Sequence, residues 1–272
     1  MTFYHPKNPD RFSSFYSIAP NLILVSILFL LARIYMKSPL IFTSRPLLMQ
    51  RLCDAVIQGY THWVAGSVDI GRCQKLVKKF DITYQILADR NLRANRTRAE
   101  LGNARLFLWY TNGTIRWWLM VTAPKKDGHA THAAHSIEKL HSAMTRNKRL
   151  EVDGYELVQI PKKETADTKW TWRMTENKYQ NWRYSIIDTV RKGSSNNMHQ
   201  MLYQLWSSPG FAGIRSQVGK LAALYRAEVQ RSSRKDAPMP PKHLPYVRRL
   251  RDGGVSVAQL LKKSTCSESE QS

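Results

Sequence analysis

The chain has 272 residues and carries 42 Lys and Arg against 20 Asp and Glu, which gives a formal net charge of +22 at pH 7. Apolar residues make up 43% of the chain and aromatic residues 10%, so it can bury a core. This composition excludes wholesale disorder, and the length suits one or two domains. The excess positive charge indicates a polyanionic partner, namely DNA, RNA or anionic lipid. The alternative is a surface that charge merely keeps soluble.

The cysteines indicate a reducing compartment. Cys53, Cys73 and Cys266 form no close pair and show no metal-ligand spacing. An odd number of isolated cysteines does not build a disulfide framework. We therefore expect a cytoplasmic protein.

An apolar segment near the start of the chain has a borderline length for a membrane span. Residues 18–36 approach the roughly 20 residues that a spanning helix needs, if Arg33 extends toward the head groups. Basic residues are more numerous after this segment than before it, so the positive-inside rule would leave the bulk of the chain in the cytoplasm, anchored to the inner membrane. The alternatives are a helix buried in a soluble fold, or an upstream extension before a start at Met49. No small-x-small cleavage pattern follows, which disfavours a signal peptide.

From Thr61 onward, strand and helix patterns alternate. Thr61–Val68 is predicted as a strand, and apolar residues from Ile70 to Phe80 share one helical face. Ile82, Tyr84 and Ile86 alternate as a second strand. Residues 133–144 are predicted as a helix.

Two hairpins are predicted from turn dipeptides. Asn112-Gly113 joins the β-rich runs 105–110 and 115–122, and Asp153-Gly154 joins 150–152 to 155–160. Residues 169–174 form another strand, on which Trp170 and Trp172 share one face. Core packing is favoured for these tryptophans over nucleobase stacking.

The pattern is helical after Thr175, a suitable N-cap. Three apolar faces cover residues 179–190, 198–206 and 211–225, and Ser207–Gly210 joins the last two helices. This turn fits a helix-turn-helix unit but also any antiparallel pair, which is favoured. Beyond Arg231 we expect an extended arm, a short helix at 255–263 and a disordered end.

The predicted fold class is therefore α+β, with a mostly antiparallel sheet, covering helices and a C-terminal helical segment. The order strand, helix, strand, hairpin, helix is compatible with a ferredoxin-like plan. The predicted parts are an N-terminal extension (1–48), an α+β domain (52–175), a helical segment (176–231) and a basic, proline-rich arm and tail (232–272).

An arginine cluster is the first candidate contact surface for nucleic acid. Arginine forks match phosphate oxygens and guanine edges, and these residues fall in an exposed helix or loop. A solvated loop is the alternative. The candidates here are Arg90, Arg93, Arg96 and Arg98, with Arg105 nearby.

A second group of cations lies on the last long helix and on the arm. A basic arm can follow a phosphate backbone or enter a minor groove, although it could equally dock on an acidic protein. These candidates are Arg215, Lys220, Arg226, Lys242, Arg248, Arg249 and Arg251.

No pattern indicates catalysis, a metal or a cofactor. His129, His132, His135 and His141 have spacings that do not converge on one side of a helix. Glu164, Asp167 and Asp188 are scattered and not clustered as two-metal nucleases require. A nuclease or replication enzyme whose site is assembled from isolated residues stays as an alternative function.

Several segments resemble a group of uncharacterised basic accessory proteins of proteobacterial conjugative plasmids and integrating conjugative elements. The likeness covers roughly residues 52–261 and is carried by the segments starting at Trp63 (WVAGSV), Trp117 (WWLMVT), Asp153 (DGYELV), Thr171 (TWRM) and Ser208 (SPGFAGIRSQV). The resemblance implies a role in replication, partition or transfer of a mobile element, and it supplies no catalytic residue. We therefore expect a nucleic-acid-binding accessory protein, with DNA as the first choice over RNA. A membrane-anchored interaction protein with a cytoplasmic basic domain is the alternative from another class.

Overall fold

The computed structural model describes residues 39–124, 132–161, 167–257 and 259–260. Within these residues no helix combines the length and the apolar character that a membrane crossing demands. The segment predicted as a membrane span, residues 18–36, lies outside the described residues, as does the disordered end predicted after residue 263. The described residues, from Pro39 to Leu260, belong to one compact unit.

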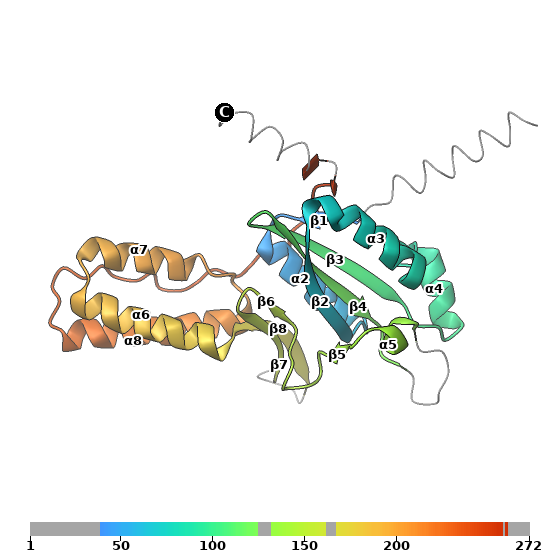
Figure 1. The fold of residues 1–272 in the computed structure, drawn as a ribbon. Helices are drawn as coiled ribbons and strands as arrows, with labels where there is room; N and C mark the ends of the chain where they lie inside the picture. The colour runs from blue at the N-terminus through green and yellow to red at the C-terminus, as the bar shows by residue number, and fades with distance from the viewer. Residues whose placement is uncertain (1–38, 125–131, 162–166, 258, 261–272) are drawn as a thin grey trace, which may run out of the picture. The chain divides into compact units, whose positions relative to one another are not determined.

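A five-stranded sheet has the strand order β1-β3-β4-β2-β5 (Figure 1). Its pairs are antiparallel except for β1 with β3. The strands are β1 (Ile41–Phe42), β2 (His62–Asp69), β3 (Ala104–Thr111), β4 (Thr114–Val121) and β5 (His141–Ser142). This mostly antiparallel sheet, with its helices, confirms the α+β class.

Between β2 and β3 the chain forms two helices, α3 (Ile70–Tyr84) and α4 (Arg90–Arg98), and one helix separates β4 from β5. This order is compatible with a ferredoxin-like plan that has one extra helix. The sheet departs from that plan through the added parallel strand β1. The last helix and strand of that order are also short, because α5 (Ala134–Ile137) has four residues and β5 has two.

Two helices cover opposite faces of this sheet. Alternate residues of a strand point to opposite faces, so Leu106 and Leu119 share a core with α3 (Ile70–Tyr84). Phe107 and Trp118 point the other way, into a core that includes α2 (Arg45–Ile57). Pro in the first turn of α2 suits a helix start, because that position needs no N–H partner.

A second, three-stranded antiparallel sheet consists of β6 (Glu151–Val152), β7 (Tyr155–Pro161) and β8 (Thr168–Met174). Both predicted hairpins are confirmed. Asn112 and Gly113 have φ of 49° and 76°, and Asp153 and Gly154 have 50° and 74°, so both positions of each turn are left-handed as a two-residue hairpin requires.

Trp172 connects the second sheet to α2. Its side chain is fully buried, and its indole Nε1 donates to the carbonyl oxygen of Met49 at 2.9 Å. Core packing is therefore confirmed for Trp172. Met49 is itself fully buried within α2.

Three helices follow the second sheet, as predicted: α6 (Glu176–Lys192), α7 (Ser195–Trp206) and α8 (Ala212–Arg231). The Thr175 hydroxyl caps α6 by accepting from the N–H of Lys178, which confirms that N-cap. The three helices pack through buried residues such as Val190, Leu202 and Leu221, which belong to the same core as α2 and β8.

Two predicted elements are wrong. Ile82 and Tyr84 belong to α3, because Phe80 and Tyr84 lie one helical turn apart and are both buried, and the helix ends only at Gln85 in a left-handed conformation. The helix predicted over 133–144 is reduced to α5, because Glu138 is extended and His141 pairs with Trp63 of β2.

The boundary predicted near residues 48–52 falls inside α2. The short helix predicted at 255–263 is described only in part. The side chains of Ser256 and Gln259 each accept a hydrogen bond from the backbone N–H of the other residue. Val257 and Leu260 are buried in the core that α3 covers.

Candidate nucleic-acid interface

The predicted contact residues fall into three regions of the fold. The first is the helix α4 (Arg90–Arg98), which follows α3. The second lies between α8 and the start of the arm, and the third is the part of the arm that runs along α2.

On α4, two of the four arginines turn inward. Arg96 donates from Nε and Nη2 to the carbonyl oxygen of Gly102, at 3.0 and 2.8 Å. Arg93 donates to the carbonyl oxygen of Ile86 at 3.1 Å, and burial followed by the nearby charge of Arg105 lowers the pKa of Arg93. Arg90 and Arg98 are exposed. The cluster is therefore divided between structural and solvent-facing arginines.

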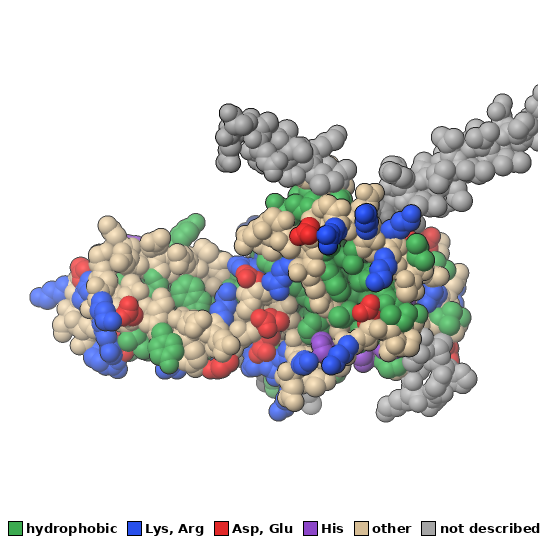
Figure 2. Space-filling view, viewed as in Figure 1, with side chains coloured by type: hydrophobic (Ala, Val, Ile, Leu, Met, Phe, Trp, Pro, Cys, Tyr) green, Lys and Arg blue, Asp and Glu red, His purple; other side chains and the backbone are tan. Residues whose placement is uncertain are grey.

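A basic face on α3 was not among the predicted contact residues. Arg72, Lys75, Lys78 and Lys79 are all exposed, and no ion pair to them is found among the described residues. Figure 2 shows basic side chains gathered over this helix. The signal was present in the sequence, since these residues alternate with the apolar positions of the predicted helix and must occupy its other face.

A groove between α7, α8 and the arm brings together Arg215, Arg226 and Lys242. It has a volume of about 370 Å³, and none of its described lining residues is acidic. Lys220 is exposed on the same helix. Trp206 also lines the groove, and its indole N–H is buried without a hydrogen-bond partner among the described residues. We call this the α8 groove.

Arg215 is fixed in the α8 groove. Its Nε donates to the carbonyl oxygen of Leu244 at 2.6 Å, and its guanidinium lies 3.3 Å from the ring centre of Tyr246. Stacking of this kind is favourable for arginine. Arg226 and Lys242 are exposed, with no ion pair to a described carboxylate. Arg215, Arg226 and Lys242 thus line one groove, and no described carboxylate there neutralises their charges.

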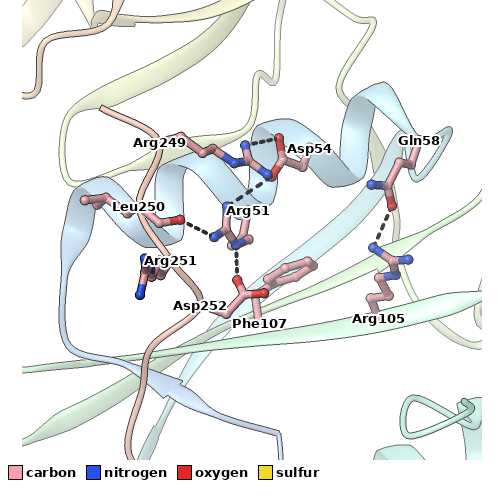
Figure 3. Close-up of a pocket in the computed structure, with 9 residues that line it drawn as sticks. All are labelled: Arg51, Asp54, Gln58, Arg105, Phe107, Arg249, Leu250, Arg251 and Asp252. Atoms are coloured by element: carbon pink, nitrogen blue, oxygen red, sulfur yellow. Dashed lines mark hydrogen bonds and ion pairs between the residues drawn. The ribbon is translucent and has the colours of Figure 1, made fainter. Parts of the chain in front are cut away.

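The part of the arm around Arg249 lies along α2 (Figure 3), which the sequence prediction did not specify. The Gln50 side chain donates to the carbonyl oxygen of Arg248 at 2.7 Å and accepts from the N–H of Leu250 at 3.0 Å. Arg249 binds both carboxylate oxygens of Asp54, at 2.8 and 2.7 Å, and this contact raises the pKa of Arg249. Arg248 and Arg251 have exposed side chains.

His132 has a structural role in the fold. His132 is buried, with Nδ1 accepting from the N–H of Ala134 and Nε2 3.0 Å from the carbonyl oxygen of Tyr84, and burial lowers its pKa. No group of three or more His, Cys, Asp or Glu side chains is placed to hold a metal ion in the part of the chain that is described. His129 and Glu164 lie outside that part.

The comparisons with known proteins give no further guide. No protein-family model, no curated protein and no solved structure matches the chain.

Proposed function

We propose that the protein binds nucleic acid, with DNA as the first choice, through the sugar-phosphate backbone. It would act as an accessory protein in the replication, partition or transfer of a mobile genetic element. The genetic context rests on the sequence resemblance, and the binding rests on the basic surfaces.

The α8 groove is the observation that carries this proposal. Arg215, Arg226 and Lys242 line a concave surface that has no described acidic residue, so their charges add. Cations that neutralise phosphates release condensed counterions, which favours binding without base recognition. Trp206 lines the groove beside these cations, and an aromatic side chain in such a place is typical of surfaces that also stack unpaired bases.

The test is a salt titration with a matched charge control. The groove variant carries Arg226→Ala and Lys242→Ala in the groove lining and Lys220→Ala next to it on α8. All three positions are exposed, so folding stability should change little. The control variant carries Lys139→Ala, Lys148→Ala and Lys169→Ala, which removes the same charge from exposed positions outside the groove. Fluorescence anisotropy with labelled duplex DNA between 50 and 200 mM salt measures affinity.

We expect the groove variant to bind more weakly and to lose about 0.9 from the salt slope for each phosphate contact removed. The control variant should keep most of the affinity. Equal weakening of both variants would mean that only net charge matters, and the groove would not be the interface. Absence of salt-dependent binding by the unmodified chain would exclude the proposed function.

A further inference from the structure

The basic side of α3 lies across the five-stranded sheet from α8. Buried residues of α3, such as Cys73 and Val77, share a core with one face of this sheet. The other face of the sheet belongs to the core that includes α8. Figure 1 shows α3 over the five-stranded sheet, and α7 and α8 at the other end of the described unit. We call the exposed basic side the α3 face; it consists of Arg72, Lys75, Lys78 and Lys79.

The α3 face is arranged against the stability of its own helix. Arg72 lies in the first turn, where the helix dipole disfavours a cation. Lys75 and Lys79 lie one turn apart on the same side, so their charges repel each other. The one carboxylate within α3, that of Asp81, accepts instead from the N–H of Leu87. Helix formation does not explain these cations, and a sequence is expected to act against local stability chiefly where it has a function.

Three of these cations form a row that matches the spacing of a phosphate backbone. Arg72, Lys75 and Lys79 follow one another along one side of the helix, because positions three, four and seven apart share a side. The row extends for about 10 Å at a rise of 1.5 Å per residue. One strand of duplex DNA presents a phosphate about every 3.4 Å along the axis, so about three phosphates fall within this length.

An anionic membrane is the other polyanion with which such a face can interact, and the packing of α3 disfavours it. A helix that lies on a membrane inserts its apolar side among the head groups. The apolar side of α3 is already buried against the sheet, with Phe80 3% and Tyr84 2% exposed. Within α3, all of which is described, Ile82 is the only large apolar side chain that is exposed. The α3 face therefore offers charge without an apolar side to insert.

We infer that the α3 face is a second nucleic-acid surface, and that one chain bridges two duplexes, one in the α8 groove and one along the α3 face. A straight duplex in the α8 groove does not also follow the α3 face, because the five-stranded sheet separates α3 from the core that contains α8. Bridging rests on the proposed function, because the first duplex is the one that the α8 groove holds.

The experiment measures bridging separately from binding. A duplex fixed to beads retains a second, fluorescent duplex only if one complex holds both. The α3 variant carries Arg72→Ala, Lys75→Ala and Lys79→Ala, and it is compared with the groove variant and the control variant described above. Fluorescence anisotropy with a single duplex measures binding, and thermal unfolding followed by circular dichroism measures the stability of each variant.

We expect the unmodified chain and the control variant to retain the second duplex. The α3 variant should still bind a single duplex, but it should retain the second duplex about tenfold less well or worse, because three phosphate contacts are lost. The groove variant should lose retention as well. The Tm of the α3 variant should stay the same or rise, because the substitutions remove the repulsion between Lys75 and Lys79 and the unfavourable cation in the first turn.

Full retention by the α3 variant would overturn bridging and leave the α8 groove as the interface. Failure of the unmodified chain to bind even a single duplex would contradict the proposed function itself. A mixture of the α3 variant and the groove variant should not retain the second duplex, because neither chain has both surfaces. Retention by the mixture would show that two copies join the duplexes, against bridging by one chain. Binding to phosphatidylserine vesicles that only the α3 variant loses, with its duplex retention unchanged, would assign the α3 face to lipid.

Discussion

Arg96 and Arg98 lie two positions apart on α4 and have opposite environments. Arg96 is partly buried and closes the loop after α4 through Gly102, with a further contact to the Gln85 side chain. Arg98 is exposed and donates to the neighbouring Asn95 side chain at 3.1 Å. The same residue type therefore holds the fold in one case and faces solvent in the other.

Replacing Arg96 by Ala should lower the free energy of unfolding by about 1–3 kcal/mol, because the half-buried Gly102 carbonyl loses a charged donor. Replacing Arg98 by Ala should change it by no more than about 0.5 kcal/mol. Urea denaturation of the two variants measures both values. Equal stability of the two variants would show that the Gly102 contact contributes nothing.

This pair also shows where sequence reasoning stops at the residue scale. The sequence of residues 90–98 indicates a basic segment that is either an exposed helix or a loop, and the structure forms a helix there. It cannot separate Arg96 from Arg98, because the acceptor of Arg96 is a backbone carbonyl whose position depends on the whole loop. Side-chain type predicts the ligand chemistry, whereas burial decides which residues are available for it.

Among the secondary-structure elements, the hairpins and the arm differ most in how far they could be predicted. Both hairpins follow from dipeptides that tolerate positive φ, which is a local property. The path of the arm depends on Gln50, whose amide bonds backbone atoms about 200 residues further along the chain. The sequence around Gln50 does not indicate that the arm binds there, and the sequence of the arm does not indicate that it contacts α2.

Gly210 controls the path of the arm. A Cβ atom at this position would lie 2.0 Å from the carbonyl oxygen of Pro245 and 2.8 Å from the backbone nitrogen of Val247, which donates to Gly210 at 3.1 Å. This contact gives a physical reason for the glycine in the segment that starts at Ser208. No side chain fits between the turn and the arm.

Gly210→Ala should therefore displace the arm from Pro245 onward and destabilise the fold by about 1–3 kcal/mol, the usual range for overpacking. Trypsin should cut faster after Arg248, Arg249 and Arg251 in this variant. Gly219→Ala in α8 is the control, since its Cβ meets nothing within 4 Å and alanine favours a helix by about 0.5–1 kcal/mol. Unchanged cleavage of the arm in Gly210→Ala would contradict this account.

For the molecule as a whole, one of the two apolar cores joins parts that the sequence separates. Buried residues of α2, of the second sheet and of α6 to α8 belong to one apolar cluster. The predicted division between residues 175 and 176 follows a real change from strands to helices, but a change of secondary structure is not a boundary between cores. Composition and periodicity do not report which elements share a core.

We expect the described unit to unfold in one transition, with far-ultraviolet circular dichroism and tryptophan fluorescence giving the same midpoint in guanidinium chloride. Trp172→Ala should shift both midpoints together and lower the free energy of unfolding by about 3–5 kcal/mol, because a fully buried side chain is lost. A separate, earlier fluorescence or dichroism transition of the helical segment would show that α6 to α8 form an independent unit.

The docked arm also has a consequence for synthesis on the ribosome. Ile41 and Val255 exchange backbone hydrogen bonds at 2.9 and 3.0 Å, so a residue near the end of the described chain completes the pairing of β1. The arm contacts α2 across a separation of 200 residues. Because synthesis adds roughly 5–20 residues per second, the arm is made about 10–40 s after α2. During that interval Arg51, Asp54 and the edge of β1 lack their arm contacts, and nascent chains are most open to mispairing there.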